Sequence, residues 1–197
     1  MIEDGQQRDP YNACIQLIER KGSQMEKKVL VAFASTHGST QEVAGVVAET
    51  LRGQGLAVDL QPARDVRSLE GYRAVILGAP LYMFHLHKDA LRFLSRHQKA
   101  LSNGLPVAVF AGGPFGKGDE QEWQEVRKEL DGELAKFPWL APLSVEVIGG
   151  RFDPSRLHFP WNLVPALKQM PPNDLRDWDA IRTWASSLVM KFQPAMS

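Results

Sequence analysis

The chain has 197 residues, of which 44% are hydrophobic and 23% are charged. This length fits one domain, and the apolar content excludes a wholly disordered chain. The 23 basic and 23 acidic side chains cancel, so no overall charge steers the protein to nucleic acid. The single cysteine, Cys14, excludes an internal disulfide and favours a reducing, cytoplasmic location. No apolar run reaches the roughly 18 residues of a membrane span, so we expect at most peripheral membrane contact.

The first 25 residues differ in composition from the rest of the chain. They mix polar residues and glycine around one short apolar patch. We therefore expect an N-terminal extension over residues 1–25 and one domain over residues 26–197. Met25 stands directly before the first strand-like run, and our hypothesis is that it is the natural start.

Strand-like and helix-like segments alternate from residue 29 onward. Short apolar runs predict strands at Val29–Ala34, Val58–Leu60, Ala74–Gly78, Val107–Ala111 and Val145–Ile148. Apolar residues spaced by three and four predict helices over 41–54, about 88–101, 120–137 and 177–190. The connection 59–74 has too few such residues for more than a short helix. This alternation predicts an α/β fold, a doubly wound five-stranded parallel sheet with helices on both faces.

A proline-rich segment interrupts the alternation after the last strand. Residues 151–174 hold five prolines together with aromatic and aliphatic side chains, too many for one long helix. We expect an inserted arm with a short helix from Trp161 to Met170. Its large apolar side chains would be costly to expose, so they should cover the domain, meet a partner or line a lipophilic pocket. They are Phe159, Trp161, Leu163, Val164 and Leu167.

The sharpest local signal lies between the first strand and the first helix. It is the run Ser35-Thr36-His37-Gly38-Ser39-Thr40. Small hydroxyl residues and glycine at a helix N-terminus offer backbone N–H donors to a phosphate group. The alternative is ordinary capping, with a capping box from Ser39 to Glu42 or with Thr40 as the cap. Ligands of doubly wound sheets bind at the carboxyl ends of the strands, which favours the phosphate.

The residues around this run resemble the flavodoxin signature for the FMN phosphate. The matching pattern is Val31-x-Phe33-x-Ser35-x-x-Gly38-x-Thr40-x-x-x-Ala44-x-x-Val47. The resemblance covers about residues 27–190 and implies a flavodoxin-like fold that binds FMN. It implies phosphate contacts from Ser35, Thr36, His37, Gly38, Ser39 and Thr40. It also implies ring contacts from the segments after the third and fourth strands, namely Ala79, Pro80, Leu81, Tyr82, Met83 and Phe84, and Ala111, Gly112, Gly113, Pro114 and Phe115.

Three of these residues are aromatic and can stack on the flavin ring. Tyr82 is the first choice, and Phe84 and Phe115 are the alternatives. In a flavoprotein the cofactor carries the electron chemistry. We therefore name no residue as catalytic.

A looser resemblance is to the menaquinone-dependent protoporphyrinogen IX dehydrogenase family. It rests on the arm and on two patterns, Gly78-Ala79-x-Leu81-x-x-x-His85-x-His87 and Gly149-Gly150-Arg151-Phe152. It implies quinone-linked oxidation of a porphyrinogen. Because the arm leaves the last strand at the carboxyl edge of the sheet, we expect it beside the flavin as one wall of a substrate or quinone pocket. Arg151 and Trp161 are the candidate substrate residues, with Arg156 as a second partner for carboxylates.

Three other patterns resemble functional sites but lack residues that such sites need. Residues 112–118 imitate a nucleotide P-loop but lack its first glycine and its metal-binding hydroxyl. His85 and His87 lack a third ligand, so we predict no metal site. We interpret Glu129, Asp131 and Glu133 as a solvated helix face.

Three functions remain open from the sequence. One is an FMN-dependent oxidoreductase acting on a small-molecule or quinone substrate. Another is an electron carrier that docks to a redox protein, and the third is a cofactor-free scaffold. Carrier flavodoxins tend to be acidic around the flavin, whereas this chain has zero net charge and an apolar arm, which favours the enzyme. The sequence leaves a homodimer open.

Overall fold

A computed structural model describes most of the chain from residue 28 onward. The described residues are 28–82, 85–116, 118–156, 163–165, 169 and 171–192. The predicted extension over residues 1–25 lies outside them, and so does most of the predicted helix from Trp161 to Met170. None of the helices in the described ranges is long and apolar enough to cross a membrane.

Within these residues, the central sheet has six strands in the order β2-β1-β3-β5-β6, with β4 paired to β3. The strands are β1 Lys28–Phe33, β2 Val58–Pro62, β3 Tyr72–Tyr82, β4 His85–Leu86, β5 Val107–Gly112 and β6 Ser144–Ile148. The pairs β1–β2, β1–β3, β3–β5 and β5–β6 are parallel. The predicted fold class is therefore confirmed, with one short antiparallel strand added at the end of β3.

The parallel strands are apolar runs because both faces of the sheet are covered. Along β1, Leu30 and Ala32 enter one core, and Val29, Val31 and Phe33 enter the other. This period of two divides the interior into two apolar layers, one on each face.

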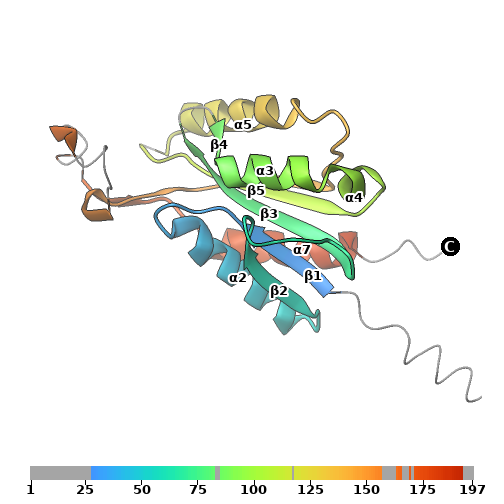
Figure 1. The fold of residues 1–197 in the computed structure, drawn as a ribbon. Helices are drawn as coiled ribbons and strands as arrows, with labels where there is room; N and C mark the ends of the chain where they lie inside the picture. The colour runs from blue at the N-terminus through green and yellow to red at the C-terminus, as the bar shows by residue number, and fades with distance from the viewer. Residues whose placement is uncertain are drawn as a thin grey trace, which may run out of the picture.

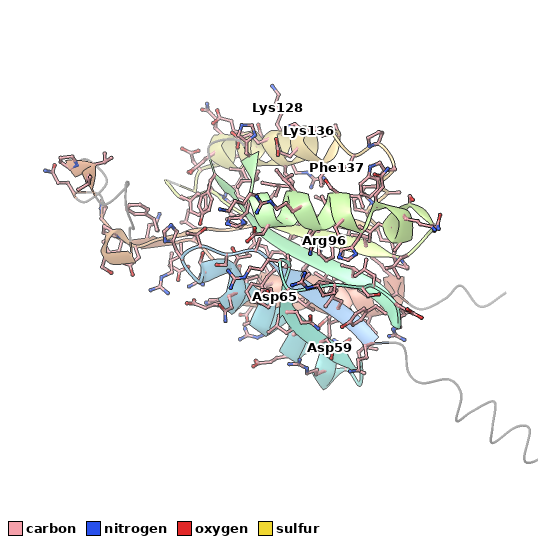
Figure 2. All side chains as sticks on the ribbon, in the orientation of Figure 1. Asp59, Asp65, Arg96, Lys128, Lys136 and Phe137 are labelled. Carbon is pink, nitrogen blue, oxygen red and sulfur yellow. The ribbon has the colours of Figure 1, made fainter. Side chains whose placement is uncertain are left out.

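Helices α2 (Ser39–Gly53) and α7 (Trp178–Lys191) cover one face of the sheet. Helices α3 (Lys88–Arg96), α4 (Gln98–Ser102) and α5 (Glu120–Leu134) cover the other face (Figure 1). Polar side chains line the outside of this second layer, and Lys128 of α5 points away from the sheet (Figure 2). Residues 63–71 contain no helix, as the sparse apolar spacing there indicated.

The predicted helix over residues 88–101 is interrupted at His97. The His97 N–H donates to the Phe93 carbonyl at 3.0 Å and ends α3. The His97 ring is buried and packs on the Phe93 ring, with 4.7 Å between the centroids. His97 is both the C-cap of α3 and the N-cap of α4, so α4 begins as a separate helix.

The arm leaves the sheet as an antiparallel ribbon. Strands β7 (Arg151–Phe152) and β8 (Asn173–Asp174) pair with each other. A 3-10 turn, η1, follows β7 over Pro154–Arg156. The ribbon projects past the carboxyl edge of the sheet (Figure 1). Leu163 and Val164 are 65% and 37% exposed, so these two side chains do not cover the domain.

The base of this ribbon is a place where backbone packs closely on backbone. A Cβ atom on Gly149 would lie 1.9 Å from the Leu175 carbonyl oxygen. A Cβ atom on Gly150 would lie 2.3 Å from the Phe115 ring. Gly149 therefore lets the returning end of the arm pack on β6–β7, and Gly150 lets the segment after β5 pack there.

Replacing Gly149 with alanine is expected to lower the free energy of unfolding by about 1–3 kcal/mol, because the rigid backbone at Leu175 must move. Chemical denaturation measures this change. The matched control is Gly45→Ala in α2, where a Cβ atom would meet nothing within 4 Å. Alanine there is expected to stabilise the helix by roughly 0.5–1 kcal/mol. Equal stability of Gly149→Ala and the unchanged protein would contradict the close approach.

Candidate functional site

The site is built where the carboxyl ends of the parallel strands meet. The chain passes from β1 outward to β2 and then returns to β3 on the other side of β1. This reversal opens a crevice between the loops after β1 and β3, the usual ligand position in such sheets. The predicted phosphate run follows β1, and the two predicted ring segments end β3 and β5.

The loop after β1 ends at Gly38, which has a left-handed φ of 89° and is the N-cap of α2. The Gly38 N–H donates to the Ser35 hydroxyl oxygen at 2.9 Å. The first intrahelical bond runs from the Glu42 N–H to the Gly38 carbonyl at 3.0 Å. The three amides between them, on residues 39–41, therefore have no acceptor inside the helix.

The predicted capping box is wrong. Ser39 is the first residue of α2, not its cap, and the N-cap Gly38 makes no side-chain cap bond. The Glu42 carboxylate instead binds Arg176 at 2.7 Å. The helix thus presents amides and the positive end of its dipole at this edge, an arrangement that fits a phosphate dianion.

Two aromatic rings stand at the ends of β3 and β5. The rings of Tyr82 and Phe115 are nearly parallel, with an interplanar angle of 18° and 6.3 Å between centroids. The His37 ring meets Tyr82 edge-on at 6.2 Å. Met83 and Phe84, the other residues predicted at this end of β3, lie outside the described residues. A flat aromatic ligand can stack on such faces.

The segment predicted as the first ring loop is mostly strand. Residues 79–82 continue β3, and β4 folds back on them, with Leu81 opposite Leu86 and Tyr82 opposite His85. Residues Ala79 and Leu81 are buried in the core, as is Ala111 of β5. Their side chains therefore face away from the site and can offer only backbone to a ligand.

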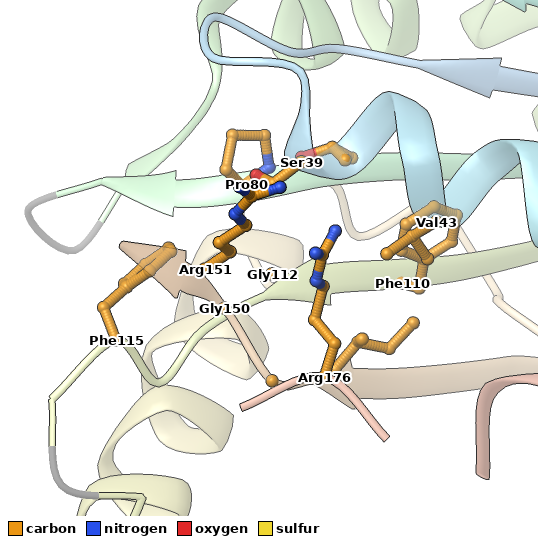
Figure 3. A pocket seen from close by; sticks show the side chains of 12 residues that line it. Ser39, Val43, Pro80, Phe110, Gly112, Phe115, Gly150, Arg151 and Arg176 are labelled. Carbon is orange, nitrogen blue, oxygen red and sulfur yellow. The ribbon is translucent and has the colours of Figure 1, made fainter. Parts of the chain in front are cut away.

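Some of the predicted residues line a recess at this edge (Figure 3), whereas residues 35–38 and Tyr82 are not part of its lining. It is lined by Ser39 and Thr40 from α2, by Pro80 from β3 and by Gly112 and Phe115 at the end of β5. Between Gly112 and Phe115 lie Gly113, which has a φ of 152°, and Pro114. The Gly113–Pro114 peptide bond is cis. Arg151 and Arg176 also line the recess. Trp161, the other predicted substrate residue, lies outside the described residues.

A hydrogen-bonded histidine links the phosphate loop to the end of β3. The Asp89 N–H donates to His87 Nδ1 at 3.2 Å, so the neutral ring carries its proton on Nε2. His87 Nε2 lies 3.0 Å from the Thr36 hydroxyl oxygen and can donate to it. Burial lowers the pKa of His87, although the Asp89 carboxylate opposes this effect. Burial also raises the pKa of Tyr82, although the nearby Thr36 hydroxyl opposes this effect. Neutral His87 therefore holds Thr36 in the loop after β1.

Glu133 of α5 is a positioning residue that the sequence misassigned to a solvated face. Its side chain is 4% exposed. Its Oε1 lies 3.1 Å from His85 Nδ1 and also binds Lys136, and its Oε2 accepts from the Leu86 N–H at 3.2 Å. Burial alone would raise the pKa of Glu133, but these hydrogen bonds outweigh it and hold the pKa below its ordinary value. Glu133 thus fixes β4 against α5.

Replacing Glu133 with glutamine is expected to lower the free energy of unfolding by about 1–3 kcal/mol, because a neutral amide cannot accept all three bonds. The folded-state pKa lies below the ordinary 4.5. The stabilisation is therefore complete above pH 4.5 and is lost as pH falls through the folded-state value. Denaturation at several pH values should show the gap between the two proteins closing in acid.

The control for this prediction is Glu129→Gln on the same helix. Burial and the nearby Glu125 raise the pKa of Glu129, so neutralising it should not destabilise the protein. A gap between Glu133→Gln and the unchanged protein that stays constant with pH would contradict a charged Glu133.

A helix N-terminus without a side-chain cap and two nearly parallel rings thus lie at the carboxyl edge of a doubly wound sheet, where such folds bind nucleotide cofactors. The profile of the flavodoxin domain family matches residues 30–161. The chain therefore belongs to the flavodoxin family, and its cofactor is FMN. The observed groups fit FMN, because the α2 amides suit its phosphate and the faces of Tyr82 and Phe115 suit its flat ring.

Solved structures and a curated relative are similar to this chain. Flavodoxin 2 from Bacillus cereus has a TM-score of 0.55 at 19% identity, over 83% of this chain and 99% of that one. A flavo di-iron protein from Thermotoga maritima has a TM-score of 0.54 at 19% identity, over 94% of this chain and 41% of that one. Protoporphyrinogen IX dehydrogenase [quinone] from Escherichia coli (strain K12) is 28% identical over 86 residues, 43% of this chain. The match spans 47% of that relative's length.

Proposed function

We propose that the protein is an FMN-dependent oxidoreductase that dehydrogenates a porphyrinogen-like substrate and reduces a quinone. The observation that carries this proposal is the attachment of the arm to the ring segment. The Asn173 side-chain amide donates to the Gly116 carbonyl at 2.6 Å, and the Gly150 N–H donates to the Pro114 carbonyl at 2.8 Å. These bonds fix the base of the arm beside the segment after β5, and the arm carries the exposed Leu163. The arm could therefore form one wall of a pocket for a lipophilic substrate.

The chemistry of the proposal is taken from the dehydrogenase of Escherichia coli, whose name gives a porphyrinogen and a quinone. In each step the substrate would lose two electrons and two protons, and one quinone would gain both and become a quinol. FMN, when bound, supplies this electron transfer. A lipophilic quinone is met at a membrane surface, which suits a cytoplasmic protein in peripheral contact with it.

The chain's own residues would bind and orient the reacting groups. The amides after Gly38 would hold the phosphate, and the rings of Tyr82 and Phe115 would hold the flavin and exclude water from its face. Neutral His87, bonded to Thr36, would hold the loop of residues 35–40 in place. No side chain has to transfer a proton in this scheme.

The test is an anaerobic assay on the purified protein. Its absorption spectrum should show flavin bands, and fluorescent porphyrin should form from a porphyrinogen only when a quinone is added. A protein that holds flavin but exchanges electrons only with redox proteins would be the electron carrier instead. Sedimentation of the same sample tests the homodimer.

A further inference from the structure

Two arginines from the base of the arm converge on the first turn of α2. Arg151 lies on β7, and Arg176 follows β8. Their Nη1 atoms lie 3.5 Å and 2.7 Å from the same oxygen, Oε2 of Glu42. Both line the recess with Ser39 and Thr40, and the Arg151 side chain points toward Ser39 (Figure 3). The arm thus brings positive charge to the end of the helix where the FMN phosphate would bind.

Arg176 is fully engaged in the folded domain. Its side chain is 3% exposed. It makes hydrogen bonds of 2.7 and 2.6 Å to Asp174 and one of 2.7 Å to Glu42. Its guanidinium carbon also lies 4.5 Å from the centroid of the Trp178 ring. These bonds hold the pKa of Asp174 below its usual range. Arg176 therefore neutralises the acidic groups beside α2 and is held against them by these bonds.

Arg151 is held differently. Its side chain is 27% exposed, and its contacts with Glu42 and Asp153 are both 3.5 Å long. That is longer than the 2.7–3.2 Å or so of a well-formed N–H···O bond. The guanidinium therefore keeps an electrostatic attraction to both carboxylates without the close geometry that fixes Arg176. It can exchange these contacts for a stronger acceptor at small cost.

A phosphate dianion at the α2 amides is such an acceptor. It would also bring negative charge close to Glu42, and a nearby cation would offset the repulsion. We infer that Arg151 is a cofactor residue that completes the FMN phosphate site, with Arg176 as its fixed neighbour. This gives Arg151 a role at the phosphate in place of the predicted role at the substrate. The inference rests on FMN binding and not on the proposed dehydrogenase activity.

Flavin titrations of the apoprotein test this assignment. Arg151→Gln is expected to weaken FMN binding by about tenfold or more, because a charge-assisted bond to phosphate is lost. Riboflavin has the same ring but no phosphate, so its affinity should not change. Arg151→Lys should recover part of the FMN affinity. The matched control is Arg182→Gln on α7, an arginine 53% exposed, which should leave both affinities unchanged. Added salt should weaken FMN binding more steeply for the unchanged protein than for Arg151→Gln.

Two results would overturn the assignment. Unchanged FMN affinity in Arg151→Gln would mean that Arg151 does not contact the phosphate. Arg151 would then be a substrate residue, and the variant should raise the KM for the substrate. An equal loss of FMN and riboflavin affinity would mean that Arg151 only shapes the recess. The proposed function can fail separately from this inference. If FMN binding depends on Arg151 but the protein reduces no quinone, the proposed function is wrong and the role of Arg151 at the phosphate still holds.

Discussion

Deleting Ser155–Met170 and joining the ends with a short Gly-Ser linker is expected to abolish quinone reduction while FMN stays bound. The deletion spares the β7–β8 ribbon, in which Arg151 pairs with Asp174 and Phe152 with Asn173. It also spares the bond from the Leu175 N–H to the Gly150 carbonyl, 3.0 Å long. The cofactor site therefore keeps its contacts, and only the proposed wall is lost. Flavin absorbance and quinone reduction, measured on the same sample, separate the two effects.

A point variant makes the same test without removing backbone. Leu163→Ser changes an arm side chain that is 65% exposed, and Met190→Ser changes one on α7 that is 73% exposed. Neither change should unfold the protein, because surface substitutions usually cost little. Only Leu163→Ser should reduce turnover. Full turnover in the shortened protein would show that the arm is no part of the pocket. If the shortened protein fails to fold, the comparison of Leu163→Ser with Met190→Ser tests whether the arm contributes to the pocket.

Replacing Ser35 with aspartate is expected to weaken FMN binding by about 10- to 100-fold. The new carboxylate can still accept the hydrogen bond from the Gly38 N–H that Ser35 accepts at 2.9 Å, so the loop keeps its shape. It adds negative charge where we expect the phosphate to bind. Charge-assisted hydrogen bonds are worth roughly 1.5–3 kcal/mol each, which corresponds to this range of affinity. Quenching of flavin fluorescence during titration measures the change.

The matched control is Ser35→Asn, which offers an acceptor of similar size without the charge. It should bind FMN within a few-fold of the unchanged protein. Riboflavin affinity should be similar in all three proteins, because riboflavin has no phosphate. If Ser35→Asp binds FMN normally, the phosphate does not lie against residues 35–40, and the recess must hold the cofactor in another way.

The sheet and the order of its elements could be predicted because the signals for them are local. Runs such as residues 29–34 and 107–111 have strand length, and the spacing in 41–54 fits one helix face. The end of β3 could not be read in this way. Pro80 and the nearby Gly78 indicate a loop, whereas pairing with β4 extends the strand to Tyr82. A hairpin of two residue pairs leaves almost no pattern in a sequence.

The polar contacts of the site could not be predicted because they join distant parts of the chain. Glu42 meets Arg176 across 134 positions, and Glu133 meets Leu86 across 47. A capping box is the local expectation for Glu42, and a solvated face is the local expectation for Glu133. Only the fold brings in the partners that change these roles. The run of residues 35–40 and Tyr82, in contrast, follow strands that the sequence predicts, and they lie near one another at the carboxyl edge; their role at the cofactor stays a prediction.

The pairing of Arg151 with Asp174 brings the two ends of the arm together, whatever lies between them. An excursion whose ends are already joined can lengthen at little thermodynamic cost, because loop-closure entropy grows only with the logarithm of length. Doubling such a loop costs about 0.6 kcal/mol. Relatives could therefore gain or lose residues beyond the ribbon and change what they accept at the flavin, while the residues around the phosphate stay as they are. The arm is the part of this fold in which new specificity can arise by insertion alone.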